Sequence, residues 1–466
     1  MSRLHGTILT SIFTEIQHIG SQNDMLRATI HIDETANDIS QSYMAIHDTS
    51  DSFQSIDVIS DEGKLQQALR KPFDLSKEFP VKWIIHQQLS YVNGNLNTAY
   101  TIYAMGHHIA VDGSSMSHLS YELLTLSEDE ALIEESTSSA SYGDFVHWQN
   151  AYLRSAAAKE AQKFWLSQIS HTAPYEWSHS KAKEIKSEDY RQMNTWGFFS
   201  NEELADWSKL YGTSWFRIAT SVIGLLVTGH SKPSPHYDHI LQVAFGARQS
   251  KFSGCISHMA NTMPIRTPVA DVLTSGGNFA DLVKNIGKRI SQAKKHEMFP
   301  FLSLIEAARQ QDESSPSDKV VVTFSPKLAD KRCTLYPVQG VWDLFFCFLE
   351  QDDGVSLGVI SDPAVFDSKT VEKLRQDFMT TVKLSQESSQ FELDSLSYLS
   401  DAKTATLAGG PHTAEVDTVS SSLVIDWIHE RCRVQPDSIA LRNGEQETSV
   451  TYSELDSESS KRAFCE

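Results

Sequence analysis

The chain has 466 residues, of which 40% are hydrophobic and 21% charged, an ordinary globular balance with enough apolar material for two or three cores. Its 40 Lys and Arg residues stand against 60 Asp and Glu residues, and the formal net charge of −20 argues against nucleic acids or anionic membranes as partners. No apolar run reaches the roughly 18 to 20 residues of a membrane span and the first residues make a poor signal peptide, so we expect a cytoplasmic protein.

The first part of the chain alternates between helical and extended patterns. Residues 8–16 carry apolar side chains at helical spacing and predict a helix, which a strand at 26–32 follows. A turn at 71–76 closes a loop. Further along we expect strands at 81–85 and 98–105, a helix over 114–124, an acidic Ser-rich loop at 128–141, and helices from 142 through 152 and around Phe164-Trp165.

A polar stretch at 171–188 predicts a crossover into a second lobe. In that lobe helical spacing predicts helices at 202–211, 215–229, 279–295 and 370–384. Apolar or alternating runs predict the strands of a central sheet at 239–245, 320–324, 343–349 and 356–360. Residues 385–422 are rich in Ser, Thr, Ala, Gly and Asp and predict a linker.

The most informative motif is His107-His108-Ile109-Ala110-Val111-Asp112-Gly113, which lies between a predicted strand and a predicted helix. Neighbouring side chains diverge in an extended or tightly turned backbone, so only one of the two histidines is expected to face a substrate. Asp112 can orient the loop, and Gly113 is expected to adopt a backbone angle that a β-carbon would resist. The arrangement suits one imidazole acting as a general base, although two satisfied core histidines beside a tight turn would give the same pattern.

His-His-x-x-x-Asp-Gly is the signature of the condensation domains of nonribosomal peptide synthetases, and the chain resembles them. Other segments resemble further motifs of the family, in the family's order. They are the Leu-Arg element ending at Arg27, Phe-Asp-Leu at 73–75, Tyr-Gly-Asp-Phe at 142–145 with Trp148, Asn-Thr-Met-Pro-Ile-Arg at 261–266, His296 with Pro300-Phe301, and the closing segment at 362–366. Together they cover about residues 20–395.

The resemblance implies an α/β, two-lobed chloramphenicol-acetyltransferase-like fold, as in CoA-dependent acyltransferases, with a central tunnel. The N-terminal lobe would be residues 1–175, the C-terminal lobe 176–395 and a linker 396–422. Residues 423–466 resemble the opening of an adenylation domain, with a helix from 423, a strand at 439–441, a turn at 442–445 and a further element at 450–455. Both ends look truncated, and no adenylation is expected because no phosphate-binding loop follows.

The resemblance also implies amide formation between a carrier-bound acyl or peptidyl thioester and a carrier-bound aminoacyl thioester. His108 would be the base or the positioner of the acceptor amine, and His107 would pack and hydrogen-bond within the loop. Asp112 would be structural, with a salt bridge to Arg27 as its expected support.

Asn261 and Arg266 would either line the tunnel or brace the second lobe. The chain would bind no cofactor itself. Donor and acceptor carrier domains would bring phosphopantetheine, and an adenylation domain would be the neighbouring partner.

Two other functions remain open at this point: an inactive remnant that only docks carrier or adenylation domains, and a stand-alone CoA-dependent acyltransferase. A metal site is not expected, because adjacent histidines chelate poorly and no Cys or Glu completes the set. The five cysteines (Cys255, Cys333, Cys347, Cys432 and Cys465) lie singly, which is typical of reduced thiols. The chain also lacks a Gly-x-Ser-x-Gly elbow and a phosphate loop with Lys-Ser/Thr.

Overall fold

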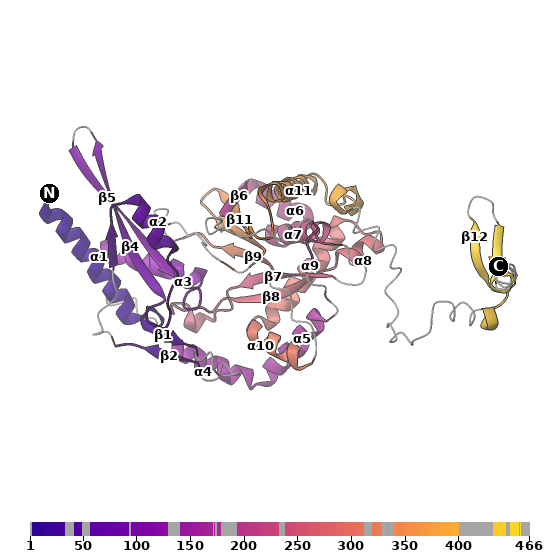
Figure 1. The fold of residues 1–466 in the computed structure, drawn as a ribbon, viewed down its shortest axis with the longest axis horizontal. Helices are drawn as coiled ribbons and strands as arrows, with labels where there is room; N and C mark the ends of the chain where they lie inside the picture. Colours follow the sequence, from indigo (N-terminus) through magenta and orange to yellow (C-terminus); the bar gives the residue numbers. More distant parts are fainter. Residues whose placement is uncertain are drawn as a thin grey trace, which may run out of the picture. The chain divides into compact units, whose positions relative to one another are not determined.

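The chain folds into two compact units, Met1–Gly410 and Pro411–Glu466. The computed structural model describes residues 2–32, 42–48, 56–92, 95–128, 140–170, 172, 175–178, 193–232, 238–311, 319–328, 333, 340, 342–399, 432–443, 448–455 and 457. The larger unit contains two lobes, each built on its own β-sheet (Figure 1).

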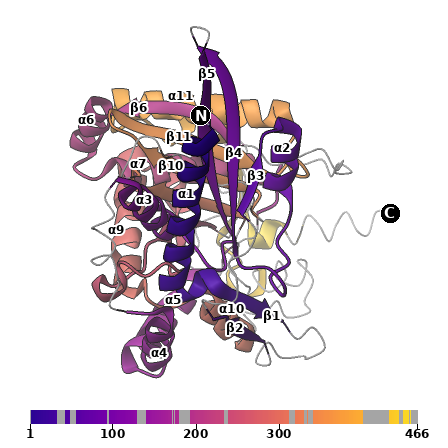
Figure 2. The same ribbon diagram turned by 90° about the vertical axis from the view of Figure 1, so that its left-hand side faces the viewer.

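The N-terminal lobe, which comprises the elements from α1 to α3, is built around a long β-hairpin (Figure 2). β4 (Val81–Val92) and β5 (Asn95–Gly106) pair antiparallel from end to end, and β3 (Ile56–Ile59) adds a parallel edge strand. The first half of β4 is buried and the described part of its second half is largely exposed. The apolar pattern therefore predicts only the inner part of each long strand.

Three helices and a second, two-stranded sheet complete this lobe. α1 (Ser2–Gln22) packs against α3 (Gly113–Glu128), and Ile16, Ile19 and Leu119 belong to their shared core. The 3-10 helix η1 (Asp24–Arg27) leads into β1 (Ala28–His31), which pairs antiparallel with β2 (Tyr43–Ile46). α2 (Glu62–Arg70) lies against β3.

Two helices, α4 (Tyr142–Leu153) and α5 (Ala156–Ile169), run from the N-terminal lobe to the C-terminal lobe (Figure 1). A capping box begins α4: the Ser141 hydroxyl accepts from the Asp144 N–H at 3.2 Å, and the Asp144 carboxylate accepts from the Ser141 N–H at 2.8 Å. α5 buries Trp165, whose Nε1 donates to the carbonyl of His296 at 3.2 Å. α5 is thereby fixed to the C-terminal lobe.

The C-terminal lobe, from β6 to η7, is built on a mixed six-stranded sheet with the order β6-β11-β10-β9-β7-β8. Its strands are β6 (Met193–Ser200), β7 (His239–Phe245), β8 (Asn261–Thr267), β9 (Val320–Ser325), β10 (Leu344–Glu350) and β11 (Gly354–Ser361). β9 is parallel to both β10 and β7, and the other pairs are antiparallel.

Both faces of this sheet are covered. Leu344, Phe346 and Phe348 of β10 belong to the main core, which they share with α7 (Trp215–His230), α9 (Phe279–Ala293) and α11 (Ser368–Glu387). The alternate residues Phe345 and Cys347 lie in a smaller cluster on the other face. Strands buried on both faces are expected to have continuous apolar runs, and the strands predicted at 320–324, 343–349 and 356–360 are confirmed as the neighbours β9, β10 and β11.

The remaining helices of this lobe are α6 (Asn201–Tyr211), α8 (Val269–Thr274), α10 (Phe301–Gln310), η4 (Ser250–Phe252), η5 (Lys294–His296), η6 (Leu393–Ser395) and η7 (Ser397–Leu399). The predicted helices at 202–211, 215–229, 279–295 and 370–384 correspond to α6, α7, α9 and α11. In the described part of the chain no single helix meets the length and hydropathy of a membrane span; α6 and α7 do so only together, across an 80° bend.

The two edge strands β6 and β8 were not predicted as strands. In β6 Trp196 is the extra residue of a bulge opposite Leu357 and Gly358, so the period of two is broken there. β8 contains Pro264, a residue that sheets tolerate at an edge, and among the described strands β8 pairs with β7 alone. The bulge and the proline therefore explain why the sequence pattern does not predict the two edge strands.

The smaller unit contains the hairpin β12 (Ile439–Asn443) and β13 (Thr448–Thr451). The strand predicted at 439–441 is confirmed as β12. Residues 432–434 are helical, whereas the beginning of the predicted helix at 423 lies outside the described residues, as do parts of the predicted turn and the loop predicted at 128–141.

Candidate active site

The loop that carries the two histidines is held between β5 and α3. The N–H of His107 donates to the carbonyl of Pro80 at 2.7 Å, and the N–H groups of Ala110 and Val111 donate back to the carbonyl of His107 at 3.0 and 3.3 Å. Gly106 is required at the end of β5, because a Cβ there would lie 2.3 Å from Val111 Cγ2. The loop is thus a closed turn on a rigid strand.

His107 points back into this turn. Its Nδ1 accepts from the N–H of Ile109 at 3.1 Å, and its ring meets the ring of Phe73 edge-on at 5.7 Å between centroids. Burial, and second the charge of His108, lower the pKa of His107. The lone pair of Nδ1 is therefore engaged within the loop.

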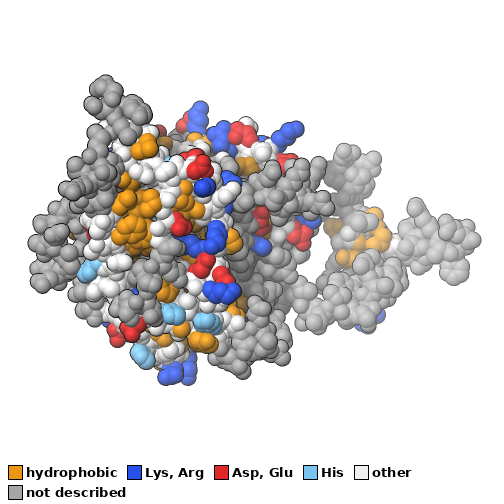
Figure 3. Space-filling view, turned by 60° about the vertical axis from the view of Figure 1, so that its left-hand side comes forward, with side chains coloured by type: hydrophobic (Ala, Val, Ile, Leu, Met, Phe, Trp, Pro, Cys, Tyr) orange, Lys and Arg blue, Asp and Glu red, His pale blue; other side chains and the backbone are white. Residues whose placement is uncertain are grey.

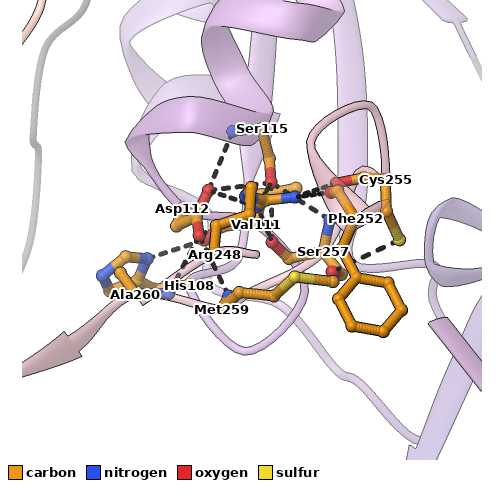
Figure 4. A network of polar contacts seen from close by, with 10 residues as sticks. All are labelled: His108, Val111, Asp112, Ser115, Arg248, Phe252, Cys255, Ser257, Met259 and Ala260. Atoms are coloured by element: carbon orange, nitrogen blue, oxygen red, sulfur yellow. Dashed lines mark hydrogen bonds and ion pairs between the residues drawn. The ribbon is translucent and has the colours of Figure 1, made fainter. Parts of the chain in front are cut away.

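His108 is exposed and is not a core histidine. Its Nδ1 lies 2.7 Å from the carbonyl oxygen of Val111, and a carbonyl can only accept, so Nδ1 carries the hydrogen (Figure 4). In the neutral ring this leaves the lone pair on Nε2, to which no described residue bonds. The loop backbone thereby holds His108 in the tautomer that can take a proton at its outward nitrogen.

Asp112 is buried, with 3% of its surface exposed, at the centre of a polar cluster (Figure 4). Its carboxylate accepts from the N–H and the hydroxyl of Ser115, both at 2.8 Å, and from the N–H groups of Met259 and Ala260 at 2.9 and 3.0 Å. Nη2 of Arg248 lies 3.1 Å from both carboxylate oxygens. Burial acts to raise the pKa of Asp112, but Arg248 and these donors outweigh it and hold the pKa below its usual value.

The expected salt bridge between Asp112 and Arg27 is wrong. Arg27 is buried and pairs with Asp24 at 2.6 Å, while its other nitrogens donate to the carbonyls of Gly20 and His47. η1 aims the side chain at the end of α1 and the end of β2, away from the loop. Arg27 therefore holds together η1, the end of α1 and the residue that follows β2 within the N-terminal lobe.

Arg248, which the sequence did not reveal, takes the place expected of Arg27. It comes shortly after β7 and directly after Ala247. The φ of Ala247, 40°, is the one positive φ at a non-glycine residue among the described residues. Arg248 also donates to the carbonyls of Phe252, Cys255 and Ser257. No motif marks it, and the only local signal is a Gly-Ala-Arg turn after a strand.

The expectation for Gly113 is also wrong. Only Gly212 and Gly276 have positive φ among the described glycines, and Gly113 instead begins α3 in ordinary helical backbone. A Cβ at this position would meet nothing within 4 Å. The glycine that the loop needs is Gly106.

Asn261 and Arg266, at the two ends of β8, make contacts that brace the C-terminal lobe. Asn261 Nδ2 donates to the carbonyls of Glu297 and Phe299 at 2.9 and 2.7 Å, and its Oδ1 accepts from the N–H of Phe301, where α10 begins. Arg266 donates to the carbonyl of Ser170 and lies 3.7 Å from a carboxylate oxygen of Asp238. These contacts tie β8 to α10 and to the end of α5.

Two lobes on separate sheets, with a histidine loop held between them by a buried ion pair, define a two-lobed α/β fold of the chloramphenicol-acetyltransferase type. Within that class the Condensation domain family matches residues 1–408, and the chain belongs to this family.

Curated relatives agree. Hybrid PKS-NRPS synthetase TAS1 of Cordyceps militaris is 56% identical over 464 residues, covering 98% of this chain and 29% of its own length. The synthetase of the same name from Pyricularia oryzae is 45% identical over 456 residues, covering 98% and 26%. Gramicidin S synthase 2 of Brevibacillus brevis is 24% identical over 435 residues, covering 88% and 9%. The chain thus spans less than a third of the length of these relatives.

Solved structures share the fold. The X-domain from teicoplanin biosynthesis superposes with a TM-score of 0.65 at 17% identity, covering 83% of this chain and 89% of its own. The condensation domain from the Monacolin K polyketide synthase MokA gives 0.63 at 12% identity, covering 82% and 90%. The first condensation domain of the CDA synthetase gives 0.60 at 14%, covering 83% and 90%.

Proposed function

We propose that this chain forms an amide bond between a carrier-bound acyl or peptidyl thioester and a carrier-bound aminoacyl thioester, as the condensation domain of a hybrid polyketide–peptide synthetase. The observation that carries the proposal is the hydrogen bond from Nδ1 of His108, an exposed residue, to the Val111 carbonyl, which leaves Nε2 able to accept a proton. Relatives named as hybrid synthetases match over 98% of the chain and support the substrate class.

The proposed step is aminolysis of a thioester. The acceptor amine attacks the donor carbonyl carbon, a C–N bond forms, and the C–S bond breaks. Nε2 of His108 takes the proton that the amine loses and returns it to the departing thiolate, so that a free thiol remains on the donor carrier. A positioned base of this kind contributes about 10² to 10⁴-fold, and holding both thioesters in one channel contributes up to about 7–11 kcal/mol.

The other motif residues act indirectly in this proposal. His107 and Asp112 fix the loop, because their polar atoms are engaged by Ile109 and by the Arg248 cluster. Asn261 and Arg266 brace the second lobe, since they contact backbone carbonyls and Asp238 rather than the histidine loop.

The organisation around this chemistry is also proposed. Residues 1–175 and 176–395 form the two lobes with the tunnel between them, and residues 396–422 link them to the opening of an adenylation domain at 423–466. The hairpin of β12 and β13 supports such an opening. Donor and acceptor carriers supply phosphopantetheine, and the chain holds no cofactor of its own.

The test uses the full chain with short acyl groups presented as phosphopantetheine thioesters and a panel of aminoacyl N-acetylcysteamine thioesters, and mass spectrometry detects the amide. We expect amide formation that His108→Ala lowers at least about 10²-fold. The matched control is His296→Ala, which removes an imidazole stacked on Phe164 outside the loop and should leave the rate within about threefold.

Each other outcome counts against the proposal. If His108→Ala forms amide at the wild-type rate, or if the chain forms none with any pair, a docking role is the better account. Transfer from acyl-CoA to a free amine, with no gain from a carrier-type thioester, would indicate a stand-alone CoA-dependent acyltransferase.

A further inference from the structure

A segment of the C-terminal lobe, residues 249–260, contacts the loop of residues 107–113, which carries the proposed base. Ile256 is buried in the N-terminal core together with Val111 and Leu119. The hydroxyl of Ser115 donates to the carbonyl of Ser257 at 2.6 Å and accepts from its N–H at 3.0 Å. The backbone on both sides of residue 258 is therefore fixed to the start of α3 and to Asp112.

His258 stands at the centre of this fixed stretch and meets His108. The N–H groups of the two following residues, Met259 and Ala260, both donate to Asp112, so three of the four residues 257–260 are clamped by one cluster. The centroids of the His258 and His108 rings are 4.6 Å apart and the rings are nearly perpendicular, at 87°. This is the edge-to-face geometry that aromatic rings prefer.

The need for such a contact follows from the exposure of His108. Its ring has one hydrogen bond, through Nδ1, and one bond leaves the ring free to tilt about the N–H···O axis. A second contact on the ring removes that freedom and fixes the direction in which Nε2 points.

We infer that His258 is a positioning residue for the condensation reaction: its ring, presented by the opposite lobe, holds the His108 imidazole so that Nε2 faces the acceptor amine. The inference rests on the proposed role of His108. His258 touches neither thioester in this scheme and acts only through His108.

The electrostatic surroundings fit this role. Burial, and second the charge of His108, lower the pKa of His258, while Asp112 and backbone groups of Val111 and Ala260 act in the opposite direction. Other charged or titratable groups in this cluster are His107, whose pKa burial and His108 lower, Arg248 beside Asp112, and His118 of α3, whose pKa is lowered by burial and by Arg248. Burial and the charge of His108 thus both favour the neutral form of His258.

The experiment compares three full-length variants. His258→Ala removes the ring, His258→Phe keeps a ring of similar size without the nitrogens, and His108→Ala removes the base. With the thioesters described above we expect His258→Ala to lower kcat about two- to tenfold with both KM values unchanged, as loss of one aromatic contact predicts. His258→Phe should restore the rate to within about twofold of the wild type.

A second measurement needs no substrate. Ring ¹⁵N spectra of histidine-labelled protein should show one fixed His108 tautomer, with hydrogen on Nδ1, in the wild type and in His258→Phe. The signals should move toward tautomer averaging in His258→Ala. Unchanged hydrogen exchange at the amides of Met259 and Ala260 shows that the clamp itself is intact.

The outcomes separate the two claims. If His108→Ala is inactive and His258→Ala keeps wild-type kinetics and a fixed tautomer, the inference about His258 is overturned and the proposed function stands. If Phe and Ala at 258 are equally impaired, an imidazole nitrogen is needed and positioning by ring contact is overturned. If His108→Ala is fully active, the proposed function itself is wrong.

Discussion

The ion pair between Asp112 and Arg248 joins the two lobes beside the loop of residues 107–113, and removing either charge leaves the other one buried. The side chains are 2% and 9% exposed. Breaking a buried pair by removing one partner costs about 3–5 kcal/mol, because the remaining charge has lost its counter-charge but not its desolvation. We expect Arg248→Met to lower the free energy of unfolding by that amount at neutral pH.

Asp112→Asn should be as harmful although it preserves the shape. An amide has one oxygen and one NH₂ group where the carboxylate has two acceptors. The NH₂ group would therefore face either the N–H groups of Met259 and Ala260, which share Oδ2, or the N–H of Ser115, which donates to Oδ1. Arg248 would also lose its counter-charge. Combining both substitutions removes both charges, so the double variant should cost less than the sum of the single ones by about 1–3 kcal/mol.

Urea unfolding of the full chain measures these differences, and hydrogen exchange of residues 255–262 reports them locally. The control is Arg375→Met, which breaks the exposed pair with Glu372 on α11 and should leave the urea midpoint unchanged within error. The folded pKa of Asp112 lies below its unfolded value, so its contribution is present above about pH 4 and is lost as the pH falls through the folded pKa. The reasoning would be refuted if the effects of the two single substitutions on the unfolding free energy simply added in the double variant. A loss of unfolding free energy under about 1 kcal/mol in Arg248→Met would also refute it.

Three further predictions concern packing and pH. Gly106→Ala should lower the free energy of unfolding by about 1–3 kcal/mol through the clash with the neighbouring valine, whereas Gly113→Ala should leave it unchanged or raise it by up to about 1 kcal/mol; equal effects in thermal melts would contradict this. Because the folded pKa of His258 lies below its unfolded value of about 6.5, stability should be full above that pH and fall below it. His258→Phe should reduce the dependence of the unfolding free energy on pH by at most about 1.4 kcal/mol per pH unit. If the urea midpoints of this variant between pH 5 and 7.5 change with pH as in the wild type, the prediction is wrong. Phe346→Ala should lower the free energy of unfolding by about 3–5 kcal/mol, and Phe198→Ala, at an exposed position, by under about 1 kcal/mol. Urea unfolding that shows the larger loss for Phe198→Ala would contradict this.

The part of the fold that the sequence predicts best is the part that is buried on both sides. β9 and β10 carry apolar residues on both faces of the sheet, so their runs are continuous and give a strong signal. The bulge at Trp196 and Pro264 in β8 interrupt the pattern at the borders of the same sheet. In the N-terminal hairpin the signal ends where the strands leave the core, although pairing continues.

The site divides in the same way, into what is local in the sequence and what is not. The loop, its closed turn and the helix after it come from consecutive residues, so the motif predicts them. Arg248 lies 136 residues from its partner Asp112 and belongs to no motif, and a single sequence offers no means of joining the two. Arg27 was a reasonable partner by motif alone, but η1 directs it elsewhere.

Figure 3 shows apolar side chains beside charged ones on one face of the molecule. Exposed apolar side chains are common on folded proteins, so exposure alone does not identify a functional surface. The polar interior between the lobes is more informative.

The loop of residues 107–113 belongs to the N-terminal lobe, yet many of the hydrogen bonds that fix it come from the C-terminal lobe. Asp112 and Ser115 receive hydrogen bonds from Arg248, Ser257, Met259 and Ala260, all of which belong to the C-terminal lobe. A loop fixed only by its own lobe would keep its shape whatever the other lobe did. Here any rotation of one lobe against the other must break charge-assisted hydrogen bonds in a buried place, each worth about 1.5–3 kcal/mol. The direction of Nε2 in His108 is consequently coupled to the relative position of the two lobes, and the proposed base would be aligned only when both lobes are in place.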